Sequence, residues 1–220
     1  MAPPENGESV RASRALDWDP ISHEYVLCAG IDQNINLFHT LQQEDPPLYQ
    51  LDHNQNLAQD TQVLDAQFST HAPHEILSCD RSGHVYLWDI RASTDTYQQR
   101  YRIHQRTCAM SLDQNRFDEH SIAVGNFDSS IMTYDLRNMH MPKSITNQAH
   151  YSLINQVQWS PHTQHLLASC STDRTLRIWD MRDSNRQNEP ANDLSKSLPL
   201  DSVDPRRSYG ANVSSFKSQK

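Results

Sequence analysis

The sequence predicts an all-β fold built from four copies of one small antiparallel sheet, and three observations support this. Four similar segments end on an aromatic residue at intervals of 50, 46 and 45 residues. In three of them an earlier aromatic residue precedes that end by 20 residues. Within each segment, short runs of alternating apolar and polar residues are separated by Pro, Asn, Asp and Ser, which favour turns. The four closing aromatic residues are Phe38, Trp88, Tyr134 and Trp179.

Each segment contains three expected strands. In the last segment these are "INQVQWS", "HLLASCS" and "TLRIWDM", separated by "PHTQ" and "TDR". A fourth strand can come from the linkers "PPLYQLD", "TYQQRYR" and "PKSITNQ". Four antiparallel strands in about 45 residues are typical of one blade of a β-propeller.

The expected repeats divide the chain into three parts. Residues 1–13 are polar and predicted to be disordered, and residues 184–220 are rich in Ser, Asn and Pro and are predicted to form a disordered tail. Residues 14–183 form the blades, with repeats at about 14–39, 53–91, 104–137 and 150–182. Because only three linkers follow the four triplets of strands, we expect an incomplete arc of about three and a half blades.

The closing motifs resemble those of the WD-repeat (WD40) family. The resemblance rests on the Trp-Asp endings, on an Asp six residues before three of the four closing aromatics, and on the pair Ala149-His150. It implies a hydrogen-bonded structural tetrad, whose members here are His150, Ser169, Asp173 and Trp179. The other repeats carry partial versions, with Ser82 at the Asp position, Val124 at the Ser position and Phe38 at the Trp position, and we expect those blades to be looser.

Charge and hydropathy argue against several classes of function. The net charge is -8, and the tail from residue 184 carries six basic and four acidic residues, so the remainder carries -10. An acidic surface does not neutralise phosphates, so we expect no direct nucleic-acid binding. There is no apolar run of about 20 residues and no signal-peptide pattern at the start, so the sequence predicts a soluble, intracellular protein without a membrane partner.

No pattern of residues indicates catalysis, a cofactor or a metal. The pairs His71/His74 and His162/His165 have ligand-like spacing, but they occupy equivalent turns of different repeats, and no Cys or acidic partner completes either site. No nucleophile elbow, P-loop or dinucleotide motif occurs. Asp17 and Asp19 are interpreted as turn formers, and the four cysteines as small buried thiols.

An arginine follows the closing dipeptide in "WDIR", "YDLR" and "WDMR", as Arg91, Arg137 and Arg182. One interpretation is a plain solvated side chain. The other rests on a resemblance to WD-repeat substrate receptors of cullin-4 RING ubiquitin ligases, above all the Cockayne syndrome group A family of transcription-coupled nucleotide-excision repair. The "GIDQNI" turn and the order of polar insertions carry that resemblance.

This resemblance implies a non-catalytic receptor in the nucleus, with the cytoplasm as the alternative location. Its partners would be the cullin-4 adaptor, reached through these arginines, and repair or transcription factors. The alternative is a WD-repeat scaffold of another pathway, because "QVQWSPH" and "LASCSTDR" are also similar to histone-binding chaperones and the peroxisomal import receptor.

Overall fold

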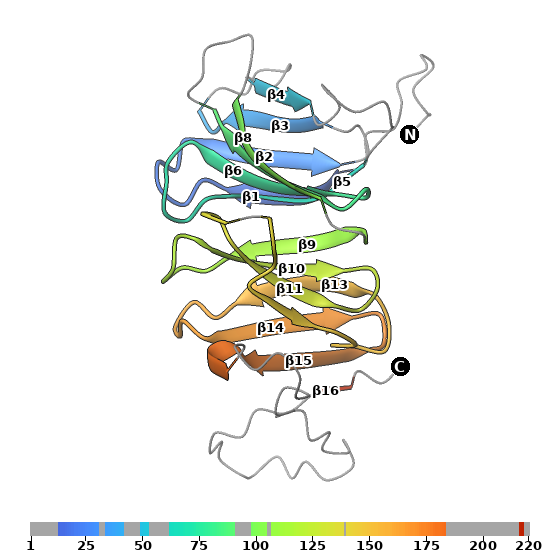
Figure 1. Ribbon diagram of the computed structural model, residues 1–220. Coiled ribbons are helices and arrows are strands. Elements are labelled where there is room, and N and C mark those ends of the chain that lie inside the picture. Colours follow the sequence, from blue (N-terminus) through green and yellow to red (C-terminus); the bar gives the residue numbers. More distant parts are fainter. Residues whose placement is uncertain are drawn as a thin grey trace, which may run out of the picture.

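The computed structural model describes residues 13–30, 34–41, 49–52, 62–90, 98–104, 107–138, 140–183 and 216–217. These residues form four antiparallel sheets of four strands each, stacked from one end of the molecule to the other (Figure 1). The first two sheets, which we call blades 1 and 2, contain β1 (Ser13–Trp18), β2 (Tyr25–Gly30), β3 (Asn34–His39), β4 (Tyr49–Asp52), β5 (Val63–Phe68), β6 (Glu75–Asp80), β7 (His84–Asp89) and β8 (Gln98–His104). Blades 3 and 4 contain β9 (Ala109–Gln114), β10 (Ser121–Asn126), β11 (Ile131–Asp135), β12 (Ser144–Thr146), β13 (Ile154–Trp159), β14 (Leu166–Ser171), β15 (Thr175–Asp180) and β16 (Phe216–Lys217).

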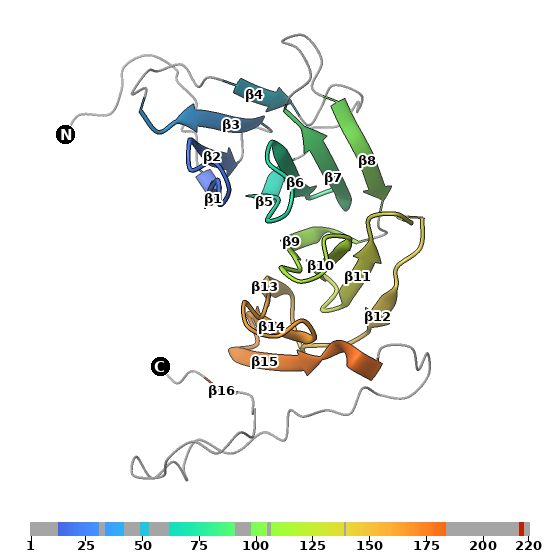
Figure 2. The same cartoon turned by 90° about the vertical axis from the view of Figure 1, so that its left-hand side faces the viewer.

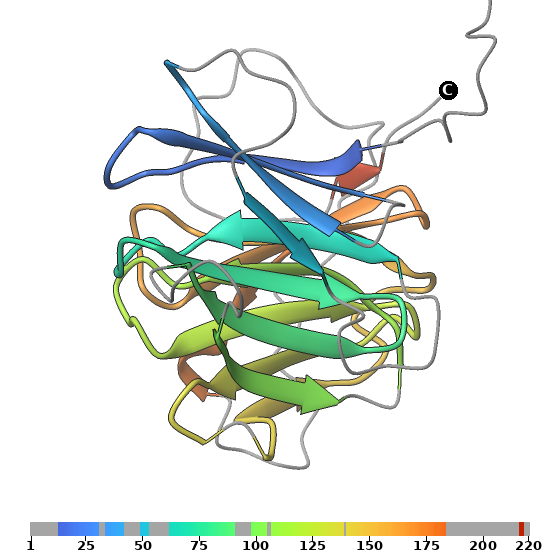
Figure 3. The same ribbon diagram turned by 90° about the horizontal axis from the view of Figure 1, so that it is seen from above.

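The sheets fan around an open centre. Figure 2 shows β1, β5, β9 and β13 on the inner side of the arc and β4, β8 and β12 on the outer side. Seen from above, the blades lie over one another with a progressive rotation of their strands (Figure 3). This arrangement confirms the predicted all-β propeller arc, and the described part of the chain contains no helix apart from the short 3-10 turn η1 (Met181–Asp183).

The last blade differs from the expectation in one respect. We expected it to lack a fourth strand, but β16 pairs antiparallel with the start of β15, opposing Thr175 to Lys217 and Leu176 to Phe216. The register of blade 1 is the same, since Leu51 of β4 opposes Ile35, which is the counterpart of Leu176. A segment placed in the expected tail therefore supplies the outer strand of blade 4. The rest of the tail, and residues 1–12, lie outside the described residues.

Apolar side chains fill the space between consecutive blades. Each of three clusters joins two neighbouring sheets, as in blades 1 and 2, where Leu27 and Leu37 belong to the same buried cluster as Phe68 and Trp88. Most strand residues of an inner blade are buried because both faces of its sheet are covered. The strands β7 and β10 are buried along their whole length. Burial of this apolar surface stabilises the arc blade by blade.

The first turn of every blade uses the same local chemistry. A short polar side chain just after the inner strand accepts two backbone N–H bonds from the residues that follow it, and these bonds stabilise a tight turn. In each blade, one side-chain oxygen accepts the backbone N–H groups of the residues two and three positions later in the chain. The four acceptor residues are Asp19, Ser69, Asn115 and Ser160. The structure therefore places Asp19 as the turn former that we expected.

Blades 3 and 4 approach closely at Gly125. A Cβ atom at this position would lie 2.7 Å from Cγ2 of Ile154 and 2.8 Å from Cγ1 of Val157. We expect Gly125→Ala to lower the free energy of unfolding by about 1–3 kcal/mol, because overpacking forces these β-branched side chains out of position. Urea denaturation would measure this change.

A double-mutant cycle controls for effects unrelated to this contact. In the Val157→Ala background one of the two contacting methyl groups is absent, so the same Gly125→Ala change should cost less. An equal cost in both backgrounds would contradict the steric explanation.

Candidate functional site

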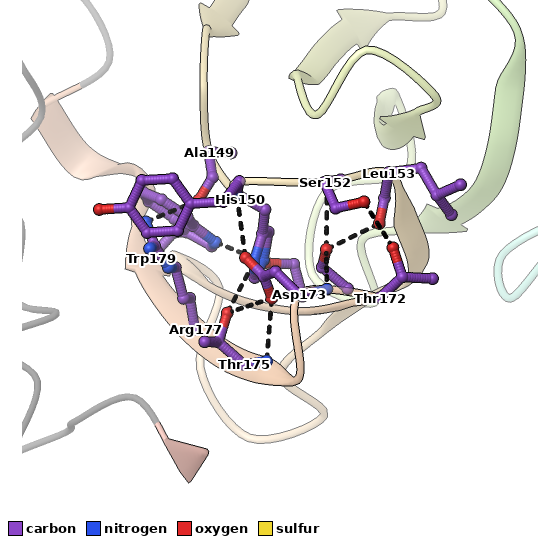
Figure 4. Close-up of polar contacts among 12 residues, drawn as sticks. Ala149, His150, Ser152, Leu153, Thr172, Asp173, Thr175, Arg177 and Trp179 are labelled. Carbon is purple, nitrogen blue, oxygen red and sulfur yellow. Dashed lines mark hydrogen bonds and ion pairs between the residues drawn. The ribbon is translucent and has the colours of Figure 1, made fainter. Parts of the chain in front are cut away.

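A hydrogen-bonded network pins blade 4, and Figure 4 shows it at the turn between β14 and β15. The Ser169 hydroxyl lies 2.7 Å from Nε2 of His150 and accepts a bond of 2.8 Å from the indole N–H of Trp179. On its other side, Nδ1 of His150 lies 3.2 Å from Oδ2 of Asp173 and 2.9 Å from the hydroxyl of Thr175. The four residues named from the sequence thus lie in one continuous network, to which the structure adds Thr175.

Burial and hydrogen bonding together set the charges in this network. Burial lowers the pKa of His150, although the neighbouring Asp173 carboxylate opposes that shift. Hydrogen bonds from Thr175 and from the backbone of Tyr151 outweigh desolvation and hold the pKa of Asp173 at about 2. A neutral imidazole that donates from Nδ1 to Asp173 and accepts from Ser169 at Nε2 satisfies all the groups, and we assign the protons in this way.

Blade 2 replaces part of the network with different residues. Trp88 donates to the Ser78 hydroxyl at 2.7 Å, as in blade 4. Asp80 and His84, both buried, form a pair with 3.2 Å between Oδ2 and Nδ1. Blade 2, which has Ser82 at the usual Asp position, thus has a buried carboxylate at Asp80 instead. In blade 3, Oδ1 of Asp128 accepts bonds from the hydroxyl of Ser130 at 2.6 Å and from its backbone N–H at 3.1 Å.

The structure also reveals carboxylates that bridge consecutive blades, and we did not anticipate these from the sequence. Oδ2 of Asp17 in β1 accepts the N–H of Phe68 at 2.8 Å, and Oδ2 of Asp113 in β9 accepts the N–H of Trp159 at 2.5 Å. Our interpretation of Asp17 as a turn former was therefore wrong, because its carboxylate bonds to the next blade and to its own neighbour Trp18.

Two further side chains, both in β5, bridge blades 2 and 3. Asp65 accepts bonds from the hydroxyl of Ser111 at 2.8 Å and the N–H of Leu112 at 3.0 Å. The amide of Gln67, oriented by its hydrogen bonds, donates to Asp113 at 3.1 Å and accepts from the N–H of Gln114 at 2.8 Å. Burial raises the pKa of Asp17 and of Asp65, and it raises that of Asp113 to about 6.

The arginines after the closing dipeptides fold back on their own strands. Nε and Nη2 of Arg137 donate to the two carboxylate oxygens of Asp135 at 3.0 and 2.7 Å. Arg182 pairs with Asp180 in the same way, through Nε at 2.9 Å and through Nη2. The two arginine side chains remain 67% and 65% exposed. Arg91 lies outside the described residues.

The Arg137 pair holds the pKa of Asp135 at about 2. An ion pair as exposed to solvent as this one contributes little to stability. Its effect is to hold the guanidinium in one orientation at the end of β11, and the Arg182 pair does the same at the end of β15. The structure thus places Arg137 and Arg182 at equivalent positions of neighbouring blades.

An aromatic side chain is held in an exposed position beside the blade 4 network. Tyr151 is 89% exposed, yet its N–H donates to Asp173 at 2.9 Å and its ring lies 5.3 Å from the guanidinium carbon of Arg177. Arg177 is held in turn by a bond of 2.8 Å to the carbonyl of Ala149. Tyr and Arg are both enriched among the residues that contribute most to protein–protein binding.

The two histidine pairs and all four cysteines lie within the described ranges. Among the described residues, no group of three or more His, Cys, Asp or Glu side chains could hold a metal ion. His71 and His74 lie in the first turn of blade 2, and His162 and His165 lie in that of blade 4. All four cysteines are free thiols; Cys79 is buried and the other three are half-buried. No helix among the described residues is long and apolar enough to cross a membrane.

The repeated four-stranded blades and the His-Ser-Asp-Trp network define a WD-repeat β-propeller. The model of one propeller family, described as "Nucleolar protein 10-like, N-terminal domain", matches residues 66–201. That span is more than half of the chain, and the protein belongs to this family of β-propellers.

Several curated proteins are similar to this chain. The peroxisomal targeting signal 2 receptor of Saccharomyces cerevisiae is 31% identical over 135 residues, covering 53% of this chain and 36% of the receptor. The WD repeat-containing protein YPL247C of the same yeast is 25% identical over 201 residues, covering 84% and 37%. Histone acetyltransferase type B subunit 2 of Debaryomyces hansenii is 27% identical over 172 residues, covering 76% and 41%. The chain thus spans about two fifths of the length of these relatives, or less.

Proposed function

We propose that this chain is a non-catalytic scaffold that binds protein partners through the loops at the ends of its blades. The observation that carries the proposal is Tyr151, which is almost fully exposed but fixed by Asp173 and Arg177. An aromatic side chain held in this way loses little conformational freedom on binding and offers a large contact area. The relatives named above support this class of function, since one is a receptor and another is a subunit of a larger enzyme.

The more specific proposal is a substrate receptor of a cullin-4 RING ubiquitin ligase in transcription-coupled repair, which would act in the nucleus. The ligase adaptor would bind Arg91, Arg137 and Arg182, and a repair or transcription factor would bind the opposite face of the blades. The orientation of Arg137 supports this role, because the guanidinium has five N–H donors and Asp135 engages only one edge of the fork. A carboxylate or a backbone carbonyl of the adaptor would bind the remaining donors.

Charge reversal tests this role of the arginines. We expect Arg91→Glu, Arg137→Glu and Arg182→Glu together to weaken binding of the purified cullin-4 adaptor by about tenfold or more, because like charges would face each other. Biolayer interferometry would measure the change. Arg174→Glu is the matched control, since Arg174 is exposed at the opposite end of β15. Unchanged binding by the triple variant would show that the arginines are plain surface residues.

The same assay distinguishes the alternative of a scaffold in another pathway. Two similarities favour that alternative: the one to a peroxisomal targeting signal 2 receptor and the one to a histone acetyltransferase subunit. Binding of a targeting signal 2 peptide or of histones, without binding of the cullin-4 adaptor, would select it. Tyr151→Ala should weaken whichever partner binds the face that carries the blade 4 network.

A further inference from the structure

One rim of the arc carries the turns that join the second and third strands of the blades. In blades 2, 3 and 4, the first residue of this turn donates its N–H to the residue just before the inner strand of the same blade. The three donors are Arg81, Phe127 and Thr172, which bond to the carbonyl groups of Gln62, Cys108 and Leu153 at 3.0, 3.0 and 3.2 Å. These bonds hold the three donors at equivalent positions on the rim, beside the inner strands.

The arginines in these turns are not neutralised by carboxylates of their own chain. Arg81 and Arg174 are both exposed, and no ion pair among the described residues involves either of them. On the opposite rim, by contrast, Arg137 pairs with Asp135. The guanidinium groups of Arg81 and Arg174 can therefore bind carboxylates of another molecule, for which their planar forks are well suited.

The carboxylates in the same turns are mostly withdrawn from the surface. Asp80 is buried beside His84, and Asp173 is held within the blade 4 network. Asp128 is exposed, but its Oδ1 accepts two bonds from Ser130. Positive charge therefore predominates at the surface of these turns, although the net charge of the whole chain is -8.

Two exposed aromatic side chains lie on the same rim. Phe127 is 58% exposed and occupies the position in blade 3 that Arg81 has in blade 2. Tyr151 is 89% exposed, and its loop is joined to the turn that carries Phe127, because the N–H of His150 donates to the carbonyl of Ser129 at 3.4 Å. A molecule that covers this rim would bury both rings, and burial of their apolar surface favours binding.

The backbone at Arg174 has a conformation that suits glycine better than arginine. Its φ is 67°, and the equivalent residue of blade 2 is Gly83, with a φ of 83°. A side chain is disfavoured in this left-handed region, so Arg174 makes its turn less stable than a glycine would. Residues that are costly for folding occur preferentially at functional sites, which indicates that the guanidinium serves binding.

We propose that this basic rim, defined by Arg81, Phe127, Tyr151 and Arg174, binds an acidic segment of a partner protein. The inference rests on the proposed scaffold function and names the class of partner for it. Carboxylates of the segment pair with the two arginines, which lie in blades 2 and 4. An aromatic or aliphatic side chain between these carboxylates packs on the two rings, of which Phe127 lies in the intervening blade.

A nucleic acid fits the basic rim less well than a peptide does. Phosphates follow one another closely along a nucleic-acid strand, so they would also face Asp128 and the acidic remainder of the protein. A peptide can place its carboxylates opposite the arginines alone. The distribution of charge therefore favours an acidic peptide segment.

Selection from a random peptide library displayed on phage, with the whole 220-residue chain immobilised, tests this proposal. We expect the selected peptides to be enriched in Asp and Glu and to carry an aromatic or aliphatic residue. A pool without acidic enrichment, whose binding is lost in Tyr151→Ala, would overturn the acidic partner and leave the scaffold function standing. Failure to select any peptide that depends on Tyr151 would count against both.

Fluorescence anisotropy with one selected, labelled peptide measures the contribution of the individual residues. We expect the double variant Arg81→Glu/Arg174→Glu to weaken binding by about tenfold or more, because like charges would then face each other. Phe127→Ala should weaken it by about tenfold, through loss of an aromatic contact. Arg137→Glu on the opposite rim is the matched control and should bind like the unaltered chain. Unchanged binding by the double variant would overturn the proposal.

Arg174→Gly separates binding from folding. Glycine adopts the φ of 67° without strain, so this variant should bind the peptide more weakly while its midpoint of urea denaturation rises. Loss of binding together with a lower midpoint would assign Arg174 a structural role and overturn its part in the site. A labelled single-stranded RNA should bind more weakly than the peptide. Tighter binding of the RNA, lost in the double variant, would assign the rim to nucleic acid instead.

Discussion

Ser169→Ala should lower the free energy of unfolding by about 2–5 kcal/mol, which is a large part of the stability of an ordinary domain. The Ser169 hydroxyl accepts the indole N–H of Trp179 and donates to Nε2 of His150. Its removal leaves that N–H and that ring nitrogen without a hydrogen bond. Each buried group that loses its only hydrogen bond costs about 1–3 kcal/mol. Urea denaturation, followed by circular dichroism, would measure the change.

Ser152→Ala provides the matched control in the same blade. The Ser152 hydroxyl accepts a surface bond from Thr172, while the bond from Ser171 goes to its backbone carbonyl and would survive the substitution. We expect a change of only a few tenths of a kcal/mol, as for most surface substitutions. Similar losses for Ser152→Ala and Ser169→Ala would contradict the view that the network, rather than any polar side chain of the blade, stabilises the sheet.

The blades could be predicted because their signals are local. Alternation within each strand and the fixed distance between aromatics reflect geometry inside one blade, so they are visible in the sequence. The turn at Asp19 also depends only on residues within three positions. The pairing of Arg137 with Asp135 is local as well, and the recurring Asp-x-Arg spacing could have indicated it.

The bridges between blades could not be predicted in this way. Asp17 and Phe68 are 51 residues apart, and an isolated Asp near the end of a strand is compatible with a turn. One signal was available in retrospect: Asp or Gln precedes the last residue of each inner strand, as in Asp17, Gln67, Asp113 and Gln158. The strand β16 was missed because its two residues follow a long polar segment and show no alternation of their own.

The bridging carboxylate Asp113 should make the protein less stable as the pH rises from about 4 to about 7. Burial raises its pKa to about 6 in the folded chain, from about 3.9 in an unfolded one. The folded state therefore binds the proton more tightly, and stability falls as the pH rises through this window and levels off above it. A difference of about two pKa units corresponds to roughly 3 kcal/mol.

Neighbouring charges modify this behaviour without reversing it. Desolvation makes the largest contribution to the raised pKa of Asp113. The charge of Arg116 lowers this pKa, and the charge of Asp65 raises it. Burial shifts the pKa values of Asp17 and Asp65 in the same direction, so they add to the slope. Asp173 has the opposite sign: its pKa of about 2 contributes stability that is lost only as the pH falls below about 4.

Asp113→Asn isolates the contribution of this one carboxylate. The amide oxygen can still accept the N–H of Trp159, but the side chain no longer titrates, so the slope between pH 4 and 7 should become shallower by up to about 3 kcal/mol in total. Urea denaturation at a series of pH values would measure it. Asp135→Asn, in β11 of the same blade, serves as the control: the pKa of Asp135 is about 2, so its contribution lies below about pH 4 and the slope between pH 4 and 7 should be nearly unchanged. A full slope in Asp113→Asn would mean that the pH dependence arises elsewhere and that this bridge between blades 3 and 4 does not carry it.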